Sequence, residues 1–239
     1  MEQTSFHFSH DIPPDSCIAL GDVHGQYYQL TQFVDWVKGS DARVIFLGDL
    51  VDRAKNPGDD LLVLNLVRAM CESPEDFGLA SCTSLIGNHE TMLLNALDGY
   101  GYRDWVSNGG DYANLKNFQE YVPWLRSLPY FVTVGDTLFT HSGGVYGTDP
   151  RDHMNSVTNR EDFVWDRSVP KRGSGLVWWT KTLKKNVFGH TPRSAMPYIS
   201  GPSGDSICID TGCYDTGTLT AYNATYNQFT QFTNVKVKS

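Results

Sequence analysis

Three short segments of the sequence combine groups that bind metals or transfer protons with glycines that let the backbone turn tightly. They read Gly21-Asp22-Val23-His24-Gly25, Gly48-Asp49-Leu50-Val51-Asp52-Arg53 and Gly87-Asn88-His89-Glu90. Carboxylate, imidazole and amide groups are the donors that divalent metal ions accept in proteins. Three such segments in one chain therefore predict a metal-assisted reaction rather than three unrelated surface turns.

Two isolated histidines extend this set of donors. His141 lies in Thr140-His141-Ser142-Gly143, and His190 lies in Phe188-Gly189-His190-Thr191-Pro192. One histidine at a strand end is most often a structural or surface residue. The metal-binding interpretation is favoured here because oxygen and imidazole donors occur at the ends of five predicted strands in the same chain.

The residues before the three segments form short apolar runs that are typical of buried strands. We expect strands at 17–20, 43–47 and 83–86, each ending close to the start of its polar segment. The carboxyl ends of parallel strands meet at one edge of an open α/β sheet. The polar segments should therefore lie side by side at that edge.

Amphipathic helices are predicted between these strands, as in βαβ units. Apolar residues between 30 and 37 recur with helical spacing, and Gly39 follows as a stop. A second helix should run through 61–70, with Asn56 as its N-cap and the following proline in its first turn. A third helix is expected at 91–97.

The remainder of the chain is less regular. Residues 98–128 are predicted to be an insertion over the sheet, and their Asn108-Gly109-Gly110-Asp111 stretch is either a wall of the substrate approach or a plain tight turn. The runs 131–134 and 137–140 predict a β-hairpin. The tail from Ser206 should add antiparallel strands to a mixed sheet system.

The composition is that of an ordinary globular protein and restricts its partners. With 239 residues, we expect a single catalytic domain over residues 1–239. Five cysteines without a CxxC pair favour reduced thiols over a disulfide framework or a thiolate zinc site. The net charge of −8 argues against a nucleic-acid partner, because such binding needs clustered Lys and Arg.

Neither a membrane segment nor an export signal is indicated. No apolar run is long enough to span a bilayer, and residues 1–7 lack the basic and apolar parts of a secretory signal. We therefore expect a cytoplasmic protein with no membrane partner and no obligatory subunit.

The motifs GDVHG, GDLVDR and GNHE, followed by two spaced histidines, resemble the calcineurin-like metallophosphoesterase superfamily. The GDxVDR and GNHE forms resemble its phosphoprotein phosphatase family, in particular the single-domain serine/threonine phosphatases of bacteria and bacteriophage lambda. The resemblance runs from about Ala19 to Thr211. It implies an α/β fold, a β-sandwich of two mixed sheets flanked by helices, with the active site at the C-terminal ends of strands.

The resemblance also implies a site for two divalent metal ions. We expect manganese, with iron, zinc, nickel or cobalt as alternatives. A hydroxide that bridges the ions would attack the phosphorus atom in line with the leaving group. The implied ligands, with Asp49 shared by both ions, are Asp22, His24 and Asp49 for the first ion and Asn88, His141 and His190 for the second.

Four further residues receive roles from the resemblance. His89 does not bind metal in this family but protonates the leaving alkoxide as general acid. Asp52 is its partner, because a carboxylate beside an imidazolium stabilises the charged form. Arg53 presents a planar fork to two phosphate oxygens. Arg167, in Val164-Trp165-Asp166-Arg167, resembles a second phosphate-binding arginine, with a surface arginine beside an aromatic anchor as the alternative.

The leading hypothesis is a phosphatase for phosphoserine and phosphothreonine in proteins, with phosphotyrosine or small phosphoesters as further substrates. The main alternative is symmetrical hydrolysis of dinucleoside polyphosphates such as diadenosine tetraphosphate. Those hydrolases share the metal ligands but typically read GNHD where this chain has GNHE. A non-catalytic binding module on the same fold is disfavoured, because every ligand and the general acid are present.

Overall fold

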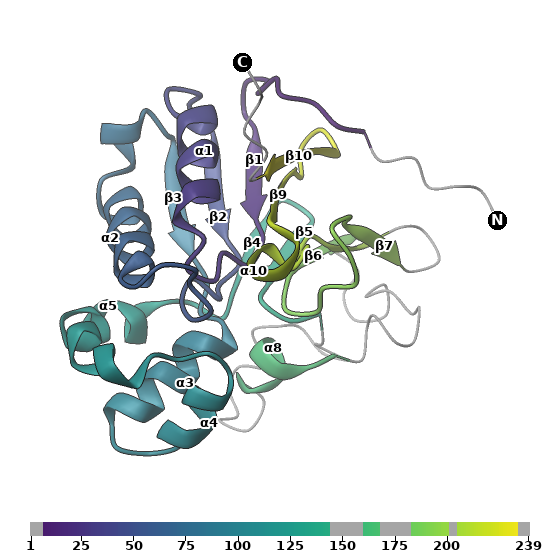
Figure 1. Cartoon of the computed structure of the whole chain (residues 1–239). Coiled ribbons are helices and arrows are strands. Elements are labelled where there is room, and N and C mark those ends of the chain that lie inside the picture. Colours follow the sequence, from purple (N-terminus) through teal and green to yellow (C-terminus); the bar gives the residue numbers. More distant parts are fainter. Residues whose placement is uncertain (1–6, 144–159, 168–182, 201–204, 234–239) are drawn as a thin grey trace.

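Two five-stranded mixed sheets face each other, and helices cover the outer face of the first sheet (Figure 1). The computed structural model describes residues 7–143, 160–167, 183–200 and 205–233. The strand order is β10-β9-β1-β2-β3 in the first sheet and β4-β5-β6-β8-β7 in the second. The strands are β1 Cys17–Leu20, β2 Arg43–Phe46, β3 Ser81–Ser84, β4 Phe131–Val134, β5 Thr137–Thr140, β6 Lys185–Phe188, β7 Tyr198–Ser200, β8 Ser206–Cys208, β9 Thr218–Asn223 and β10 Gln228–Thr233.

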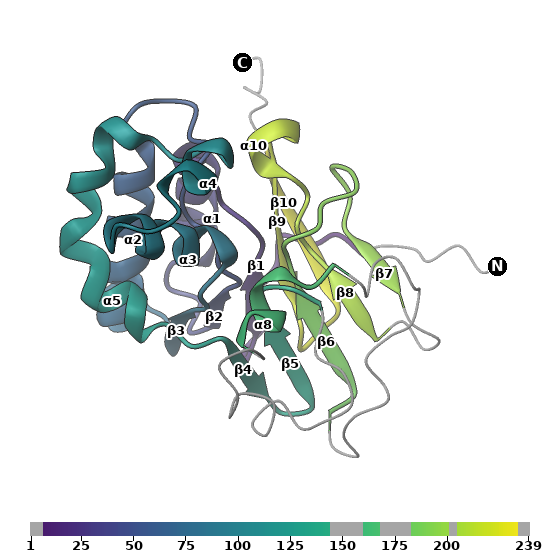
Figure 2. The same ribbon diagram turned by 90° about the horizontal axis from the view of Figure 1, so that it is seen from below.

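Most helices lie together on one side of the first sheet (Figure 2). This group consists of α1 to α5, while α8 lies beside the second sheet and α10 contacts β9 of the first sheet. The α-helices are α1 Tyr27–Val37, α2 Asp59–Glu72, α3 Asn88–Leu97, α4 Tyr102–Ser107, α5 Val122–Ser127, α8 Asp162–Trp165 and α10 Cys213–Thr216, and the 3-10 helices are η1 Pro74–Phe77 and η2 Tyr112–Tyr121.

The parallel strands β1, β2 and β3 form the part of the first sheet that carries the polar turns. Alternate side chains of a strand point to opposite faces. Ile18 and Leu20 of β1 pack into the core under the helices, while Cys17 and Ala19 pack between the two sheets. Both faces are covered, which explains why this strand is apolar throughout. Each fully buried Ile or Leu contributes about 1.5–3 kcal/mol.

The helix α1 follows the prediction, but the start of α2 does not. Helix α1 ends at Val37, before the turn at Gly39. Helix α2 begins at Asp59 rather than beside Asn56, because Gly58, with φ 88°, supplies the left-handed conformation at the N-cap. The Asn56 side chain donates instead to the carboxylate of Asp59, at 2.7 Å. The predicted cap at Asn56 was therefore wrong.

Both the third strand and the third helix begin earlier than predicted. Strand β3 occupies 81–84 rather than 83–86, since the amide of Ile86 leaves the ladder and donates to the carbonyl of Pro129. Helix α3 begins at Asn88 rather than Thr91. The Glu90 carboxylate accepts the Gly87 amide at 2.8 Å, which satisfies a free donor at the helix start. The polar motif therefore forms the first turn of the helix.

The second sheet contains the predicted hairpin, and β4 pairs with β5 over the full length of both strands. Strands β5, β6 and β8 run parallel, so their following turns also meet at one edge. The expectation for the tail was only partly correct. β9 and β10 are antiparallel but join the first sheet, whereas β8 lies parallel to β6. Alternating apolar residues predict a strand but do not specify its partner.

Residues 98–128 do not lie over the sheet as predicted. They form α4, η2 and α5, which pack mainly against α3 and α2. The reason is a set of large apolar side chains that complete the core on the helical side. Trp105, Phe118, Tyr121 and Leu125 are all at most 2% exposed. This segment is a second helical layer rather than a loop.

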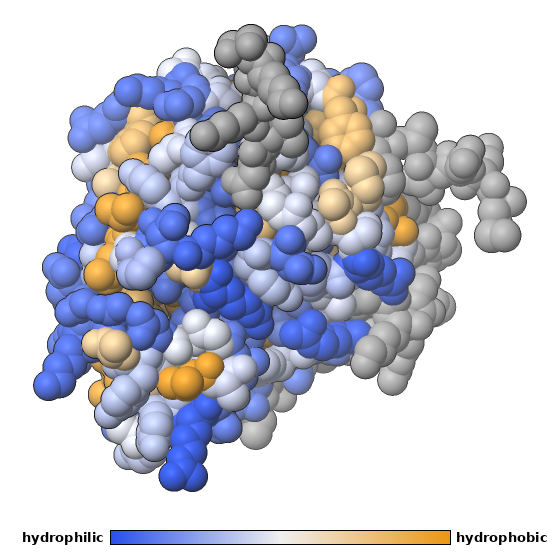
Figure 3. All heavy atoms as spheres, in the orientation of Figure 1, coloured by the Kyte–Doolittle hydropathy of each residue, from blue (hydrophilic) through white to orange (hydrophobic). Residues whose placement is uncertain are grey.

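The surface gives no sign of a membrane segment. On the face shown in Figure 3, hydrophobic residues form small separate groups among hydrophilic ones. Within the described ranges, no helix combines the length and apolar content that crossing a membrane requires. Scattered exposed apolar residues are normal for a folded protein and need no special explanation.

Candidate metal centre and active site

The turns after β1, β2 and β6 hold site residues in unusual backbone conformations. Eight non-glycine residues in the described part of the chain have positive φ. Such conformations cost roughly 1–3 kcal/mol each and persist where the surrounding structure fixes them. The amide of His24 donates to the carbonyl of Asp49 at 2.9 Å and thereby ties two of these turns together. Five of the eight are predicted site residues: His24, Asp49, Asp52, Arg53 and His190.

Asp49 lies between two groups of potential ligands. Its Oδ2 is 3.5 Å from Nε2 of His24, and its Oδ1 is 3.4 Å from Nε2 of His141. The backbone amide of His89 donates to Oδ1 at 3.0 Å, which fixes the orientation of the carboxylate. Each oxygen of one buried carboxylate thus faces a different imidazole. This arrangement suits a ligand that two ions share.

The second group of potential ligands surrounds His141. Its Nε2 lies 3.0 Å from Oδ1 of Asn88 and 3.2 Å from Nδ1 of His190. Its Nδ1 is 2.9 Å from the carbonyl of Leu47, so Nδ1 carries a proton and donates to that carbonyl, while Nε2 faces the other donor atoms. Donor atoms of Asp49, His141 and His190 lie within 4.8 Å of one another. The same holds for His24, Asp49 and His89.

Two of these imidazoles are neutral at physiological pH. Burial lowers the pKa of His24 to about 3. Burial, together with the neighbouring His141, lowers the pKa of His190 to about 2. Neutral imidazole is the form that ligates metal ions. By contrast, His141 has a raised pKa, because the Asp49 carboxylate outweighs the lowering effect of burial.

Several buried carboxylates lie close together in the same place. Burial, then the nearby Asp210 and Asp49, raises the pKa of Asp22 well above its usual range. Burial also raises the pKa of Asp210 to about 6. Closely spaced carboxylates cannot all ionise without compensating cations. Imidazole, amide and carboxylate donors that converge in this way fit two divalent metal ions.

His89 forms a short hydrogen-bonded pair with Asp52. The distance from Nδ1 of His89 to Oδ2 of Asp52 is 2.6 Å, and Asp52 is fully buried. Burial raises the pKa of Asp52, although its hydrogen bond to His89 opposes this shift. The other ring nitrogen of His89 lies on the cavity side, 3.9 Å from Oδ2 of Asp49. The pair can therefore hold a proton next to a bound substrate.

Two arginines line the same cavity, which has a volume of about 250 Å³. The guanidinium of Arg53 lies over the ring of Tyr214, 4.6 Å from its centroid, and Nη1 is 2.7 Å from Nε2 of His24. The exposed Arg167 donates from Nη1 to the carbonyl of His190 at 2.7 Å. Two cationic forks therefore border a space already lined by imidazoles and carboxylates.

All ten residues that were predicted to form the site are brought together. Asp52 and His141 lie directly behind the cavity, hydrogen-bonded to His89 and to Asn88 respectively. The other eight line the cavity: Asp22, His24, Asp49, Arg53, Asn88, His89, Arg167 and His190.

The cavity wall also contains Asn108, from the stretch offered as a wall of the substrate approach, together with Trp165 and Pro192. Its two remaining residues, Asp210 and Tyr214, received no role from sequence reasoning. Asp210 is 2% exposed and follows β8 in the segment Ile209-Asp210-Thr211-Gly212. A carboxylate directly after a short apolar strand is the same signal that identified Asp22, so this residue could have been found. Tyr214 carries no comparable signal, because a single tyrosine in a short helix is unremarkable in sequence.

Glu90 braces the site from behind. Its carboxylate accepts the amides of Asp49 at 2.9 Å, Leu50 at 2.7 Å and Gly87 at 2.8 Å. The side chain is fully buried, and burial together with the Asp49 charge raises its pKa. One carboxylate therefore connects the turn after β2 with the start of α3. The sequence showed Glu90 only as the last letter of its motif.

The model of the family described as calcineurin-like phosphoesterase matches residues 17–225, which is most of the chain. The protein therefore belongs to this family. It is a metallophosphoesterase, a hydrolase of phosphoesters, and the family depends on two metal ions. The expected fold, two mixed sheets flanked by helices, is confirmed.

Relatives carry two different activities in their names. A probable serine/threonine-protein phosphatase of Encephalitozoon cuniculi is 25% identical over 162 residues, which cover 67% of this chain but only 33% of that protein. A symmetrical bis(5'-nucleosyl)-tetraphosphatase of Methylococcus capsulatus is 25% identical over 263 residues, covering 85% of this chain and 89% of that protein. A serine/threonine phosphatase structure from Saccharomyces cerevisiae matches with a TM-score of 0.61 at 16% identity, over 94% of this chain and 81% of that one.

Proposed function

We propose that the protein is a metal-dependent phosphomonoesterase that acts on phosphoserine and phosphothreonine in proteins, and on phosphotyrosine. The observation that carries this proposal is the cavity of about 250 Å³ with its polar lining. Such a space admits a phosphate group with its metal ions, while the leaving group stays at the surface. A site of this kind discriminates weakly among leaving groups, which suits several phosphorylated side chains.

In this proposal Asp22, His24 and Asp49 hold one ion, and Asp49 holds a second ion together with three further residues. Bound metal ions would supply Lewis-acid polarisation of the phosphoryl oxygens and a lowered pKa for bound water. Manganese is our expectation, since sites of this kind accept several first-row ions and cellular supply selects among them. The three further ligands of the second ion are Asn88, His141 and His190.

The protein side chains then bind and orient the phosphate. Arg53 and Arg167 are proposed to donate to its oxygens, and lysine could not reproduce their planar fork. Nε2 of His24 accepts from Arg53 at 2.7 Å. Because this nitrogen cannot serve an arginine and a metal ion at once, a metal ion held by His24 would leave the Arg53 guanidinium available to the substrate.

Proton transfer is assigned to His89. Asp52, at 2.6 Å from Nδ1, stabilises the imidazolium and leaves the proton on Nε2 directed to the cavity. That proton passes to the oxygen of the leaving serine or threonine as its bond to phosphorus breaks. General acids of this kind contribute roughly 10²–10⁴-fold to the rate.

The test is a substrate comparison with metal-free protein reconstituted with individual ions. We expect activity to return with manganese and kcat/KM to be higher on phosphoserine and phosphothreonine peptides than on diadenosine tetraphosphate. A chromogenic phosphomonoester serves as a reference. An efficiency on the dinucleotide more than about tenfold above that on the peptides would overturn the proposed substrate.

A second candidate function is symmetrical cleavage of dinucleoside tetraphosphates. It is favoured by the extent of the match to the Methylococcus tetraphosphatase, which covers 89% of that protein. Under this alternative the nucleoside groups would lie outside the small polar cavity. Analysis of products separates the two functions, since symmetrical cleavage yields two nucleoside diphosphates whereas a monoesterase releases inorganic phosphate.

A further inference from the structure

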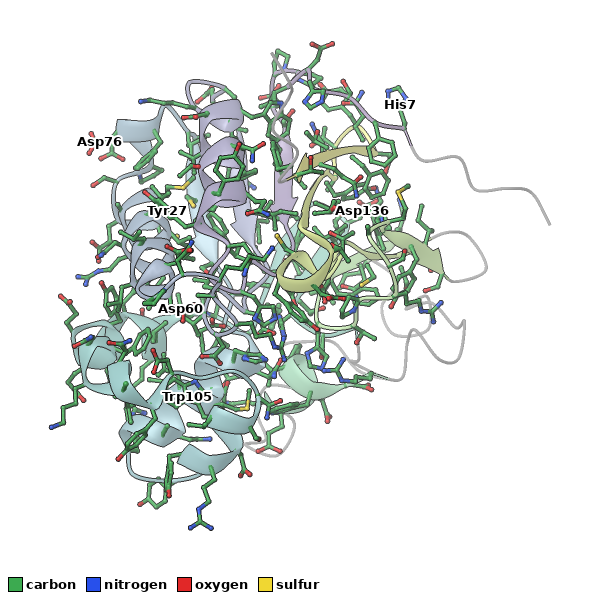
Figure 4. The ribbon with its side chains drawn as sticks, in the orientation of Figure 1. His7, Tyr27, Asp60, Asp76, Trp105 and Asp136 are labelled. Atoms are coloured by element: carbon green, nitrogen blue, oxygen red, sulfur yellow. The ribbon has the colours of Figure 1, made fainter. Side chains whose placement is uncertain are left out.

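The indole of Trp105 is hydrogen-bonded to the pair formed by His89 and Asp52. Nε1 of Trp105 donates to Oδ1 of Asp52 at 2.8 Å, and Oδ2 of Asp52 bonds to Nδ1 of His89 at 2.6 Å. Trp105 belongs to α4, in the helical layer formed by residues 98–128, where Figure 4 labels it. We propose that Trp105 is a positioning residue that acts through Asp52 to hold His89 in place for proton transfer. This proposal rests on the proposed function.

The burial of all three side chains makes this contact consequential. Trp105 and Asp52 are each fully buried, and His89 is 2% exposed. Water therefore cannot replace the indole as the donor to Oδ1. A buried carboxylate oxygen without a donor is unfavourable, so loss of Nε1 would lead Asp52 to rotate or shift. His89 would then lose its fixed orientation.

The indole ring is itself held in one position. A Cβ at Gly110 would clash with Cε2 of Trp105, so the ring packs directly on the backbone of this glycine. The ring of Phe118 meets it edge-on, with 6.3 Å between centroids and 87° between planes. The amide of Gly110 also donates to the carbonyl of Trp105 at 3.1 Å. A donor whose ring and backbone are both held in this way can fix the carboxylate that it bonds.

Trp105 thus contributes to proton transfer from the helical layer without itself lining the cavity, whose wall includes Asn108 of the same layer. Asp52 comes from the turn after β2, and His89 comes from the first turn of α3. Their relative placement depends on both backbone elements, whereas Trp105 adds a third and separate anchor. Among the side chains that the structure describes, Trp105 and His89 are those found to bond the Asp52 carboxylate.

The decisive variant is Trp105→Phe, which keeps an aromatic ring and removes the donor. A general acid matters most for a poor leaving group such as a serine alkoxide and least for a good one such as p-nitrophenolate. We expect kcat on a phosphoserine peptide to fall about tenfold and kcat on p-nitrophenyl phosphate to fall less than about twofold, with KM little changed on either. The variant His89→Asn should show the same dependence on leaving group, with larger losses.

The matched control is Trp36→Phe. It also removes an indole donor, since Nε1 of Trp36 donates to the carbonyl of His10 at 2.6 Å. This bond joins α1 to the chain before β1, away from the cavity. The control should retain wild-type rates on both substrates. An equal loss on both substrates in Trp105→Phe would contradict the positioning role. The double variant provides a second test. If Trp105→Phe lowers kcat of the His89→Asn protein by the same factor as kcat of the wild type, the positioning role is also contradicted, because a residue acting through His89 has no effect without it.

Two measurements keep the proposal testable if the phenylalanine variant folds poorly. Incorporation of benzothienylalanine at position 105 preserves the two-ring shape and lacks only the N–H donor, so it should give the same kinetic pattern. The proton in the short bond between His89 and Asp52 should give a downfield NMR resonance that shifts or disappears in this variant; an unaltered resonance would overturn the proposal. Weak turnover of the phosphopeptide by the wild-type protein would instead contradict the proposed function.

Discussion

The two sheets contribute to the cavity in different ways. The first sheet supplies its residues from short continuous motifs in the turns after β1, β2 and β3. The second sheet supplies isolated residues, His141 after β5 and His190 after β6. The difference lies in the bonds that support each side. The first-sheet turns are connected to one another by several backbone bonds and by the Glu90 carboxylate.

The second-sheet residues are attached to the first sheet by fewer bonds. Nδ1 of His141 bonds to the carbonyl of Leu47, and the amide of His190 donates to Asp22 at 3.0 Å. The first-sheet side is therefore a preorganised frame. The second-sheet side completes the ligand set once the sheets have packed together. Variants on the two sides should therefore differ in their effects.

The largest effect is expected for Asp49→Asn, because Asp49 faces donors from both sides. Loss of one charge at a shared ligand should weaken the binding of both ions and lower kcat by at least about 10³-fold. Metal content by mass spectrometry and phosphatase rates measure the change. The exposed Asp136→Asn is the control for a lost carboxylate. Two tightly bound ions and near-normal turnover in Asp49→Asn would show that the two sides do not share this ligand.

A smaller effect, confined to the first-sheet frame, is expected for Glu90→Gln. One of the three amides that Glu90 accepts would then face an NH₂ donor instead of an oxygen. We expect the free energy of unfolding to fall by roughly 1–3 kcal/mol and activity to fall about tenfold. Urea titration and steady-state rates give both numbers, with the exposed Glu120→Gln as control. Unchanged stability would mean that the frame does not depend on this brace.

The two arginines test the comparison directly, since Arg53 belongs to the first-sheet side and Arg167 to the second. Arg53 is stacked on Tyr214 and is half-buried, whereas Arg167 is exposed. Arg53→Lys should raise KM about tenfold and Arg167→Lys only about threefold, because a lysine loses the planar fork at either site. Inhibition by inorganic phosphate should weaken in the same order. A larger increase in KM for Arg167→Lys than for Arg53→Lys would contradict the expected order of the two sides.

The smallest effect concerns Asp60, at the start of α2 behind the first-sheet turns (Figure 4). Burial, then the Asp52 charge, raises its pKa from 3.8 to about 7, and its Oδ1 has no hydrogen-bond partner. Between about pH 4 and about pH 7 the folded protein holds this proton and the unfolded chain does not, so stability falls as pH rises.

Asp60→Asn removes this titration and should flatten the dependence of unfolding free energy on pH. The expected gain at neutral pH is on the order of 2 kcal/mol relative to wild type. Urea titrations at a series of pH values measure it, with the exposed Asp76→Asn as control. A pH profile identical to that of the wild type would show that Asp60 does not carry the proton.

Much of the site could be predicted because its residues lie next to strand ends. A buried strand appears in the sequence as an apolar run, so its end can be located. This explains why Asp22, Asp49 and His141, each next to a strand end, could be predicted to come together. The helical layer was misjudged for the opposite reason. Its glycines and scattered aromatics have no clear period, so the burial of Trp105 against Gly110 could not be read from spacing. The cap of α2 failed because Gly58, not Asn56, supplies the required left-handed turn.

The donor types, the polar turns that hold them and the apolar strands before these turns can be read from the amino-acid sequence. These are local properties, because a turn residue and an apolar run are encoded within a few positions. Three features follow from the folded structure instead: the donors that face the two oxygens of Asp49, the partner strands of β8 and of β9, and the bond from Trp105 to Asp52 across 53 positions. Such contacts join segments far apart in the chain, and they depend on packing, which no local pattern specifies.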